Sequence, residues 1–266
     1  MRVAVAGKGG TGKTTVAGTL ARLLARRGRP VLAVDADTNP NLAAIAGLES
    51  GTGEEFSGLP SGLLERVEGD DGPRSVLTRP AAEVVDEYAA PGPDGVRVMV
   101  MGRVGHAGKG CMCRAHSSMR AVVGEVVGDP ALARQDVVMD MEAGLEHLSR
   151  GTGRHVDVMV AVVEPYYRAL ETGRRVVELA RELGTDRIVA VPNKVRDDGD
   201  RKAVGDYLQA QGIAALGEVP FDGSLLDAER AGLAPIDHDP ESPAVRAIGE
   251  VLTALEARVA GAGKPA

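Results

Sequence analysis

The chain has very few aromatic residues, no tryptophan, two cysteines and no long hydrophobic run. Aromatics make up 2% of its 266 residues, which argues against a stacking surface for single-stranded nucleic acid. A formal net charge of −7 makes the chain a poor binder of phosphate backbones. No apolar run approaches the ~18 residues of a membrane span, and the N-terminal residues lack the apolar stretch of a signal peptide. We therefore expect a cytoplasmic protein that binds neither nucleic acid nor membrane.

Short Val-rich segments alternate with amphipathic helical patterns along the chain. The patterns predict strands at 2–6, 30–35, 96–101, 135–140, 156–163, 187–191 and 213–219, and helices at 13–27, 114–128, 168–183, 200–210 and 244–260. Apolar strands that alternate with helices are typical of a buried parallel sheet. We predict an α/β fold with a mostly parallel central sheet, flanked by helices on both faces, in a single domain spanning 1–260.

Two segments interrupt this alternation. Residues 49–95 are rich in Gly, Pro, Asp and Glu, with short helical patterns at 61–68 and 80–89. Because a structureless loop of that length is unusual, we predict an insertion that is partly helical or mobile. The last residues, 261–266, are expected to form a frayed tail.

Residues 7–14, GKGGTGKT, match the G-x-x-x-x-G-K-[ST] phosphate loop and lie between a predicted strand and a predicted helix. In that context backbone N–H groups and the helix N-terminus surround the phosphates of a nucleotide. We expect Lys13 to reach the β- and γ-phosphates of ATP and Thr14 to ligate Mg²⁺. The nucleotide-binding residues of this loop are predicted to be Gly9, Gly10, Thr11, Gly12, Lys13, Thr14 and Thr15. The predicted fold is therefore that of a P-loop NTPase.

Three aspartates lie at or just after the ends of predicted strands. Asp140 ends an apolar run, which is the Walker B pattern, and is expected to hold Mg²⁺ through a water. Strand 30–35 ends in Asp35-Ala36-Asp37, and carboxylates at this end of a parallel strand lie at the ligand crevice. We predict that Asp35 contacts Mg²⁺ or its waters. The alternative for this pair is a loop aspartate or a helix cap.

The two cysteines, Cys111 and Cys113, lie in a turn before helix 114–128. In extended backbone, side chains at i and i+2 point the same way, so two thiolates can bind one soft ion such as Zn²⁺ or Ni²⁺. They supply half of a tetrahedral shell. His106 and His116 could complete it within one chain, or a second copy could supply two more thiolates. Inert buried cysteines, a redox pair and a dimer-bridging iron–sulfur cluster remain open.

The loop GKGGTGKT resembles the deviant Walker A loop of the MinD/ParA/nitrogenase-iron-protein superfamily. The resemblance implies that Lys8 crosses a dimer interface to contact the partner's nucleotide. It also implies that Asp37 orients the attacking water and that the backbone N–H of Gly144 binds the γ-phosphate. Glu142, beside Gly144, is then a switch residue without a proton role, although Glu142 and Glu146 could be mistaken for general bases.

Two short motifs after successive strands resemble the base-binding loops of the same superfamily. Asn193-Lys194 follows strand 187–191, and Pro220-Phe221-Asp222 follows strand 213–219. The resemblance implies that Asn193 reads the adenine amino group, and that Lys194, Pro220 and Asp222 belong to the nucleotide site.

The deviant loop, the C-x-C turn and DMEAGLEHLSRGT at 140–152 together resemble CO-dehydrogenase nickel-insertion ATPases of the CooC type. That resemblance implies an ATP-hydrolysing homodimer that holds Ni²⁺ or Zn²⁺ on paired Cys111 and Cys113. It would deliver nickel to an acceptor such as CO dehydrogenase. Competing hypotheses are a MinD/ParA-like positioning ATPase, an iron–sulfur redox or cluster-carrier ATPase and a metabolic kinase or ligase.

Overall fold

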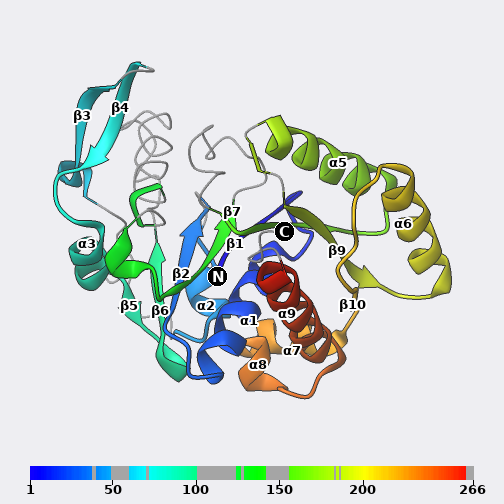
Figure 1. The fold of residues 1–266 in the computed structure, drawn as a ribbon. Helices are drawn as coiled ribbons and strands as arrows, with labels where there is room; N and C mark the ends of the chain where they lie inside the picture. Colours follow the sequence, from blue (N-terminus) through cyan, green and yellow to red (C-terminus); the bar gives the residue numbers. More distant parts are fainter. Residues whose placement is uncertain are drawn as a thin grey trace, which may run out of the picture.

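The computed structural model is built around one central sheet (Figure 1). It describes residues 1–37, 40–48, 60–69, 72–100, 124–126, 129–141, 156–182, 184–185 and 187–261. The main sheet has eight strands in the order β10-β9-β8-β1-β7-β2-β6-β5. Every pairing in it is parallel except that of β5 with β6.

The strands agree closely with the Val-rich runs. In chain order they are β1 (Arg2–Gly7), β2 (Val31–Ala36), β5 (Ala90–Pro91), β6 (Val96–Val100), β7 (Asp136–Met141), β8 (Val158–Val163), β9 (Ile188–Val195) and β10 (Val219–Pro220). All residues of β2, β7 and β8 are buried. Strands of this kind read as unbroken apolar runs because helices cover both of their faces.

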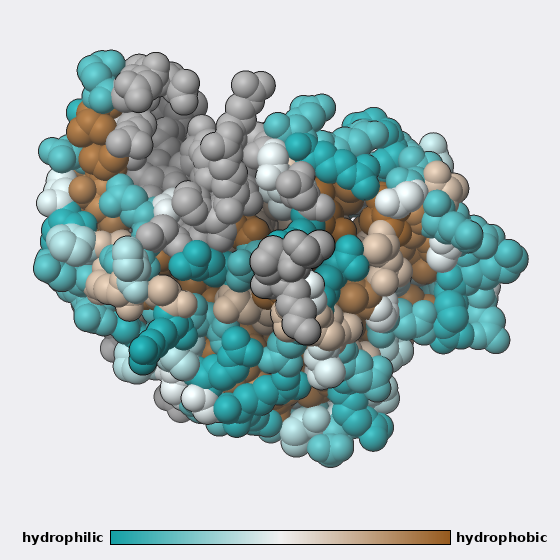
Figure 2. Space-filling model, in the orientation of Figure 1, coloured by the Kyte–Doolittle hydropathy of each residue, from teal (hydrophilic) through white to brown (hydrophobic). Residues whose placement is uncertain are grey.

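Two helical layers cover the sheet, and each buries one set of alternating strand residues. Val3 and Val5 belong to the core shared with α1 (Lys13–Arg26) and α9 (Pro243–Gly261). Ala4 and Ala6 face the opposite core, which α5 (Tyr167–Glu182) helps to form. Also on the first side lie α2 (Leu42–Ile45), α7 (Gly223–Ala231) and α8 (Pro235–His238), and on the second α3 (Ala81–Tyr88) and α6 (Asp198–Ala210). The outer surfaces of α5 and α6 are hydrophilic (Figure 2). The predicted α/β fold is confirmed.

The prediction of helical structure at 61–68 is wrong. Only Ser61–Leu63 are helical, as a 3-10 turn (η1), and β3 (Leu64–Gly69) pairs with β4 (Gly72–Leu77) in an antiparallel hairpin. Leu64 and Val67 have helical spacing, but the polar residues between them leave too little apolar surface for a buried helical face. Strand pairing instead satisfies the backbone groups of this polar segment. The helix predicted at 80–89 is confirmed as α3.

Strand 213–219 is much shorter than predicted. It is reduced to a bridge between Ala190 and Ala215 and to the two residues of β10. Gly217 lies between them at φ +77°, a left-handed conformation that interrupts an extended strand. Of the predicted helix 114–128, only residues 124–126 are described, and they are helical. No helix in the described ranges combines the length and the apolar character needed to cross a bilayer.

Candidate functional site

The strand order brings the phosphate loop and the predicted metal-binding aspartates together. In the sheet β7 lies between β1, which leads into the loop, and β2. The register pairs Asp140 with Val5 on one side and with Asp35 on the other. Asp140 therefore ends its strand beside both the loop and the second carboxylate. This is the carboxyl edge of the sheet, where ligands of open α/β folds bind.

The phosphate loop is a tight turn closed on Lys8. The carbonyl oxygen of Lys8 accepts hydrogen bonds from Thr11 N at 3.2 Å and Thr11 Oγ1 at 2.8 Å. Gly12 then starts helix α1 at φ +90° and supplies no side-chain cap. The N–H groups of the first turn of α1 consequently have no capping side chain, and such groups form an anion site. Lys13, the first residue of α1, is buried with 6% of its surface exposed.

Asp140 carries a buried carboxylate group near the end of β7. Within the described residues neither of its oxygens has a hydrogen-bond partner of good geometry. Burial raises the pKa of Asp140 to about 7, and the charges of Asp35 and Asp37 add to this rise. The Thr14 hydroxyl and the charge of Lys13 lower the pKa and so oppose it. A hard divalent cation satisfies such oxygens, so Thr14 and Asp140 fit Mg²⁺. When bound, Mg²⁺ neutralises phosphate charge.

Asp35 shapes the loop that follows β2. Its Oδ1 accepts from Asp37 N at 3.0 Å, and its Oδ2 accepts from Asn41 N at 2.9 Å and Leu42 N at 2.8 Å. Burial raises the pKa of Asp35, and these three N–H donors oppose the rise. The side chain thus holds the start of α2 close to β2 and places Asp37 near the charge of Asp140. A contact between Asp35 and Mg²⁺ remains a prediction, as does the role of Asp37 in orienting water.

The predicted base-side residues lie at the end of β9 and around β10. Asn193 is buried and its Nδ2 donates to Thr11 O at 2.6 Å, which turns its Oδ1 to the opposite side of the amide. Lys194 Nζ donates to Gly10 O at 2.6 Å. Asp222 caps α7 through Ser224 N and also accepts from Ala244 N at 3.0 Å, while Pro220 ends β10. Contacts of these residues with adenine remain predictions.

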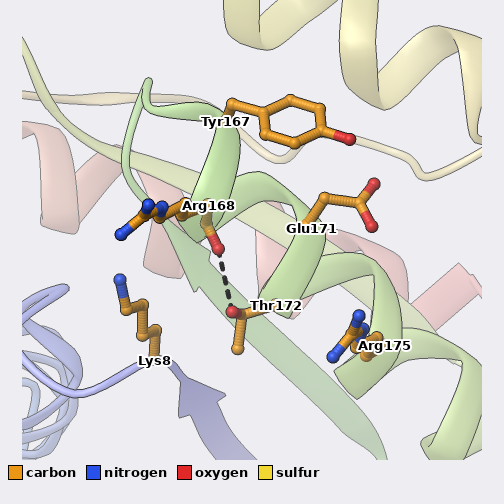
Figure 3. A pocket seen from close by; sticks show the side chains of 6 residues that line it. All are labelled: Lys8, Tyr167, Arg168, Glu171, Thr172 and Arg175. Carbon is orange, nitrogen blue, oxygen red and sulfur yellow. Dashed lines mark hydrogen bonds between the residues drawn. The ribbon is translucent and has the colours of Figure 1, made fainter.

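Lys8 points away from the loop towards helix α5 (Figure 3). It lines a hollow of about 430 Å³ together with Tyr167, Arg168, Glu171, Thr172 and Arg175. Three of these six side chains are cationic, and the one carboxylate, Glu171, already accepts from Tyr207 Oη and Arg174. The exposed Lys8 therefore lies on a positively charged face of the molecule beside the phosphate loop.

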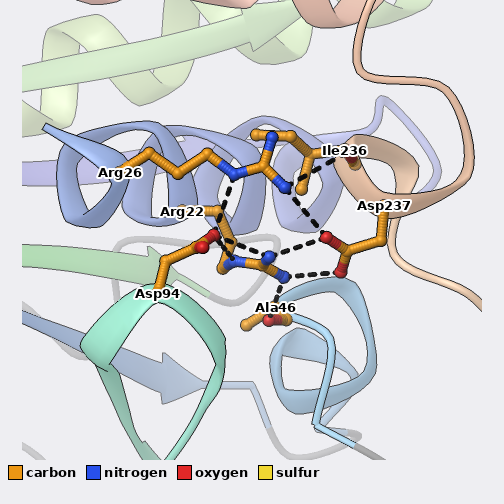
Figure 4. A network of polar contacts seen from close by, with 6 residues as sticks. All are labelled: Arg22, Arg26, Ala46, Asp94, Ile236 and Asp237. Atoms are coloured by element: carbon orange, nitrogen blue, oxygen red, sulfur yellow. Dashed lines mark hydrogen bonds and ion pairs between the residues drawn. The ribbon is translucent and has the colours of Figure 1, made fainter.

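Two charged residues that the sequence analysis missed form ion pairs, one at this edge of the sheet and one further along α1. Glu164, just after β8, forms an ion pair with Lys194 at 2.8 Å. Arg22 of α1 is 1% exposed and binds Asp94 and Asp237 at 2.7 Å and Ala46 O at 2.8 Å (Figure 4). A carboxylate at the carboxyl end of a parallel strand is a sequence signal for Glu164. Arg22 carries no such signal because its partners are far away in the chain.

Several predicted site residues lie outside the described residues. They are Cys111, Cys113, His106, His116, Glu142, Gly144 and Glu146. Among the residues that are described, no three His, Cys, Asp or Glu side chains are grouped so that they could hold a metal ion. The soft-metal site and the γ-phosphate switch therefore remain predictions.

Comparison with known proteins identifies a nucleotide-binding family and relatives that match most of the chain. Residues 3–236 match the CobQ/CobB/MinD/ParA nucleotide-binding domain. The chain is 36% identical to the carbon monoxide dehydrogenase accessory protein CooC of Rhodospirillum rubrum, over 90% of this chain and 91% of that protein. It is 35% identical to an uncharacterised ATP-binding protein of Methanocaldococcus jannaschii, over 90% and 92%. The MinC–MinD cell division complex of Aquifex aeolicus contains a chain of the same fold, with a TM-score of 0.67, 20% identity and coverage of 100% and 98%.

Proposed function

This chain belongs to the CobQ/CobB/MinD/ParA family of nucleotide-binding domains, and from that premise we propose that it is a nickel-insertion ATPase serving a CO dehydrogenase-like enzyme. Hydrolysis of ATP follows from the family, and ATP with Mg²⁺ fits the loop and Asp140. The observation that carries the nickel assignment is the 36% identity to a CO dehydrogenase accessory protein, in a chain whose two cysteines form a C-x-C pair.

The working form in this proposal is a homodimer. Two copies supply four thiolates from Cys111 and Cys113, the number that a tetrahedral site for a soft cation needs. In this dimer Lys8 faces the partner subunit and reaches the partner's nucleotide. The cationic hollow of Lys8, Arg168 and Arg175 supports this, because three positive side chains beside one engaged carboxylate favour an approaching anion. ATP binding closes the two copies, and hydrolysis loosens the metal for transfer to the acceptor.

Metal binding by a thiol-free variant tests the proposal. We expect Cys111→Ala/Cys113→Ala to lose stoichiometric Ni²⁺ and Zn²⁺ binding in equilibrium dialysis while basal ATP hydrolysis continues. Met112→Leu, which changes the residue between the two thiols, is the matched control and should bind metal as the wild type does. Undiminished metal binding by the double variant would reject the cysteine site.

The oligomeric state separates this proposal from its competitors. Light scattering should show a dimer with ATP and Ni²⁺, and Lys8→Met should shift it towards the monomer. A visible absorption band after anaerobic purification would instead indicate a bridging iron–sulfur cluster. Sedimentation with liposomes in the presence of ATP would favour a MinD-like positioning ATPase.

A further inference from the structure

Two consecutive carbonyl groups of the phosphate loop are held by two consecutive side chains from the end of β9. Lys194 Nζ donates to Gly10 O and Asn193 Nδ2 donates to Thr11 O, both at 2.6 Å. These contacts join residues more than 180 positions apart in the chain. The strand end therefore binds the outer side of the loop rather than the space inside it.

Holding these carbonyls sets the direction of the N–H groups in the same peptide units. In a trans peptide the C=O and N–H bonds point in opposite directions. With Thr11 O fixed outward by Asn193, the N–H of Gly12 is directed to the inner side of the loop. With Gly10 O fixed by Lys194, the N–H of Thr11 is aimed at Lys8 O, the bond that closes the turn. Lys194 thus acts on the turn that carries Lys8.

The ammonium group of Lys194 is itself fixed by a carboxylate. Glu164 Oε1 lies 2.8 Å from Lys194 Nζ, and the Glu164 side chain is 17% exposed. Lys194 also has φ +59°, a left-handed backbone that costs a non-glycine residue about 1 kcal/mol. Surrounding contacts must offset that cost, and the bonds to Glu164 and Gly10 are two of them. The positive charge of Lys194 is therefore paired with a carboxylate of the same chain.

We propose that Lys194, held by Glu164, is a positioning residue that keeps the phosphate loop in its anion-binding shape through the carbonyl of Gly10, without contacting the nucleotide. This inference goes beyond the proposed function, since it concerns ATP binding whatever metal or acceptor the protein serves. It assigns Lys194 to the loop and leaves base recognition to the other base-side residues.

Binding of tripolyphosphate separates the two roles, because that ligand has phosphates but no base. We expect Lys194→Met to weaken the binding of Mg-ATP, Mg-GTP and tripolyphosphate by a common factor of about tenfold. This is the effect of losing one charge-assisted hydrogen bond. Lys194→Arg, which keeps the charged donor, should restore most of the affinity. Glu164→Gln should likewise weaken the binding of all three ligands by one common factor.

Controls and kinetics complete the test. Lys202→Met removes an exposed lysine that pairs with Asp206 on α6 and should leave all three affinities unchanged. In steady state we expect the KM for ATP to rise in Lys194→Met while kcat at saturation stays within about twofold, because a bound triphosphate restores the loop. A loss of ATP affinity with normal tripolyphosphate binding in Lys194→Met or Glu164→Gln would overturn the inference. Unchanged affinity for all three ligands would overturn it as well.

Discussion

The raised pKa of Asp140 should make the nucleotide-free protein less stable as the pH rises towards 7. The pKa of this carboxyl is about 7 in the folded chain and about 3.9 in an unfolded one. Between these values the folded state holds a proton that the unfolded state has lost. The stabilising effect of that proton is complete below the unfolded pKa and disappears as the pH passes the folded pKa. A separation of about 3 pKa units corresponds to roughly 4 kcal/mol in total.

About a third of this change falls in a range of pH that is easily reached in the assay. Integrating proton release from a group of pKa about 7 between about pH 6 and about pH 8 gives a loss of about 1.4 kcal/mol in the free energy of unfolding. The assay is urea denaturation of the metal-free and nucleotide-free protein at both pH values. Asp140→Asn has no proton to release at this position, so its stability should fall by about 1.4 kcal/mol less than that of the wild type.

The comparison between variants removes the contribution of every other titrating group. Asp206→Asn, at an exposed carboxylate paired with Lys202, serves as the control and should follow the wild type. Adding Mg-ATP should flatten the pH dependence of the wild type, because the cation needs the ionised carboxylate, and should have little effect on Asp140→Asn. Parallel pH profiles for the wild type and Asp140→Asn would refute the account of Asp140.

Two further substitutions test the buried ion network of α1 and the conformation of the phosphate loop. Arg22→Met should destabilise the protein by about 2 kcal/mol in urea denaturation, because it removes the buried centre of the network while its carboxylate partners retain some contact with water. Arg26→Met, at the half-exposed edge of the same network, should cost less than about 1 kcal/mol, and equal losses would contradict the ranking. Gly12→Ala should abolish ATP binding measured by calorimetry, since its Cβ would lie 2.3 Å from Asn193 Nδ2 at φ +90°. Gly205→Ala, where a Cβ meets nothing within 4 Å, should bind ATP normally, and normal binding by Gly12→Ala would show that the loop adapts.

The sequence was sufficient for the parts of the fold that depend on local pattern. Parallel strands buried on both faces must be apolar throughout, so β1, β2, β7 and β8 were readable as Val-rich runs. The phosphate loop could be predicted because its motif requires a preceding strand and a following helix, and the sequence predicts both. The hairpin of β3 and β4 could not be predicted, since Leu64 and Val67 are three residues apart, a spacing typical of a helix, and lie on opposite faces of the strand that forms.

The assembly of the site depends on the strand order, which local pattern does not encode. Asp35 and Asp140 each end a strand in the sequence, but their adjacency arises because β7 enters the sheet between β1 and β2. The pairing of Glu164 with Lys194 likewise needs β8 and β9 to be neighbours and Lys194 to adopt a left-handed backbone. A base-side motif therefore revealed the position of Lys194 at the nucleotide edge, but not the bond that its ammonium group forms with the loop.

One continuous segment, residues 164–175, lies beside the phosphate loop and its supporting lysine. Glu164 holds Lys194 against Gly10, and α5, which begins at Tyr167, presents Arg168 and Arg175 to the hollow that Lys8 lines. Gly10 and Lys8 belong to the same closed turn. Glu164 precedes α5 by three residues, so a movement of α5 would act on the turn through Glu164 and Lys194. If a second copy binds over Lys8 and moves α5, its effect on nucleotide affinity should be reduced when the Glu164–Lys194 pair is broken, because that pair connects the segment to the loop.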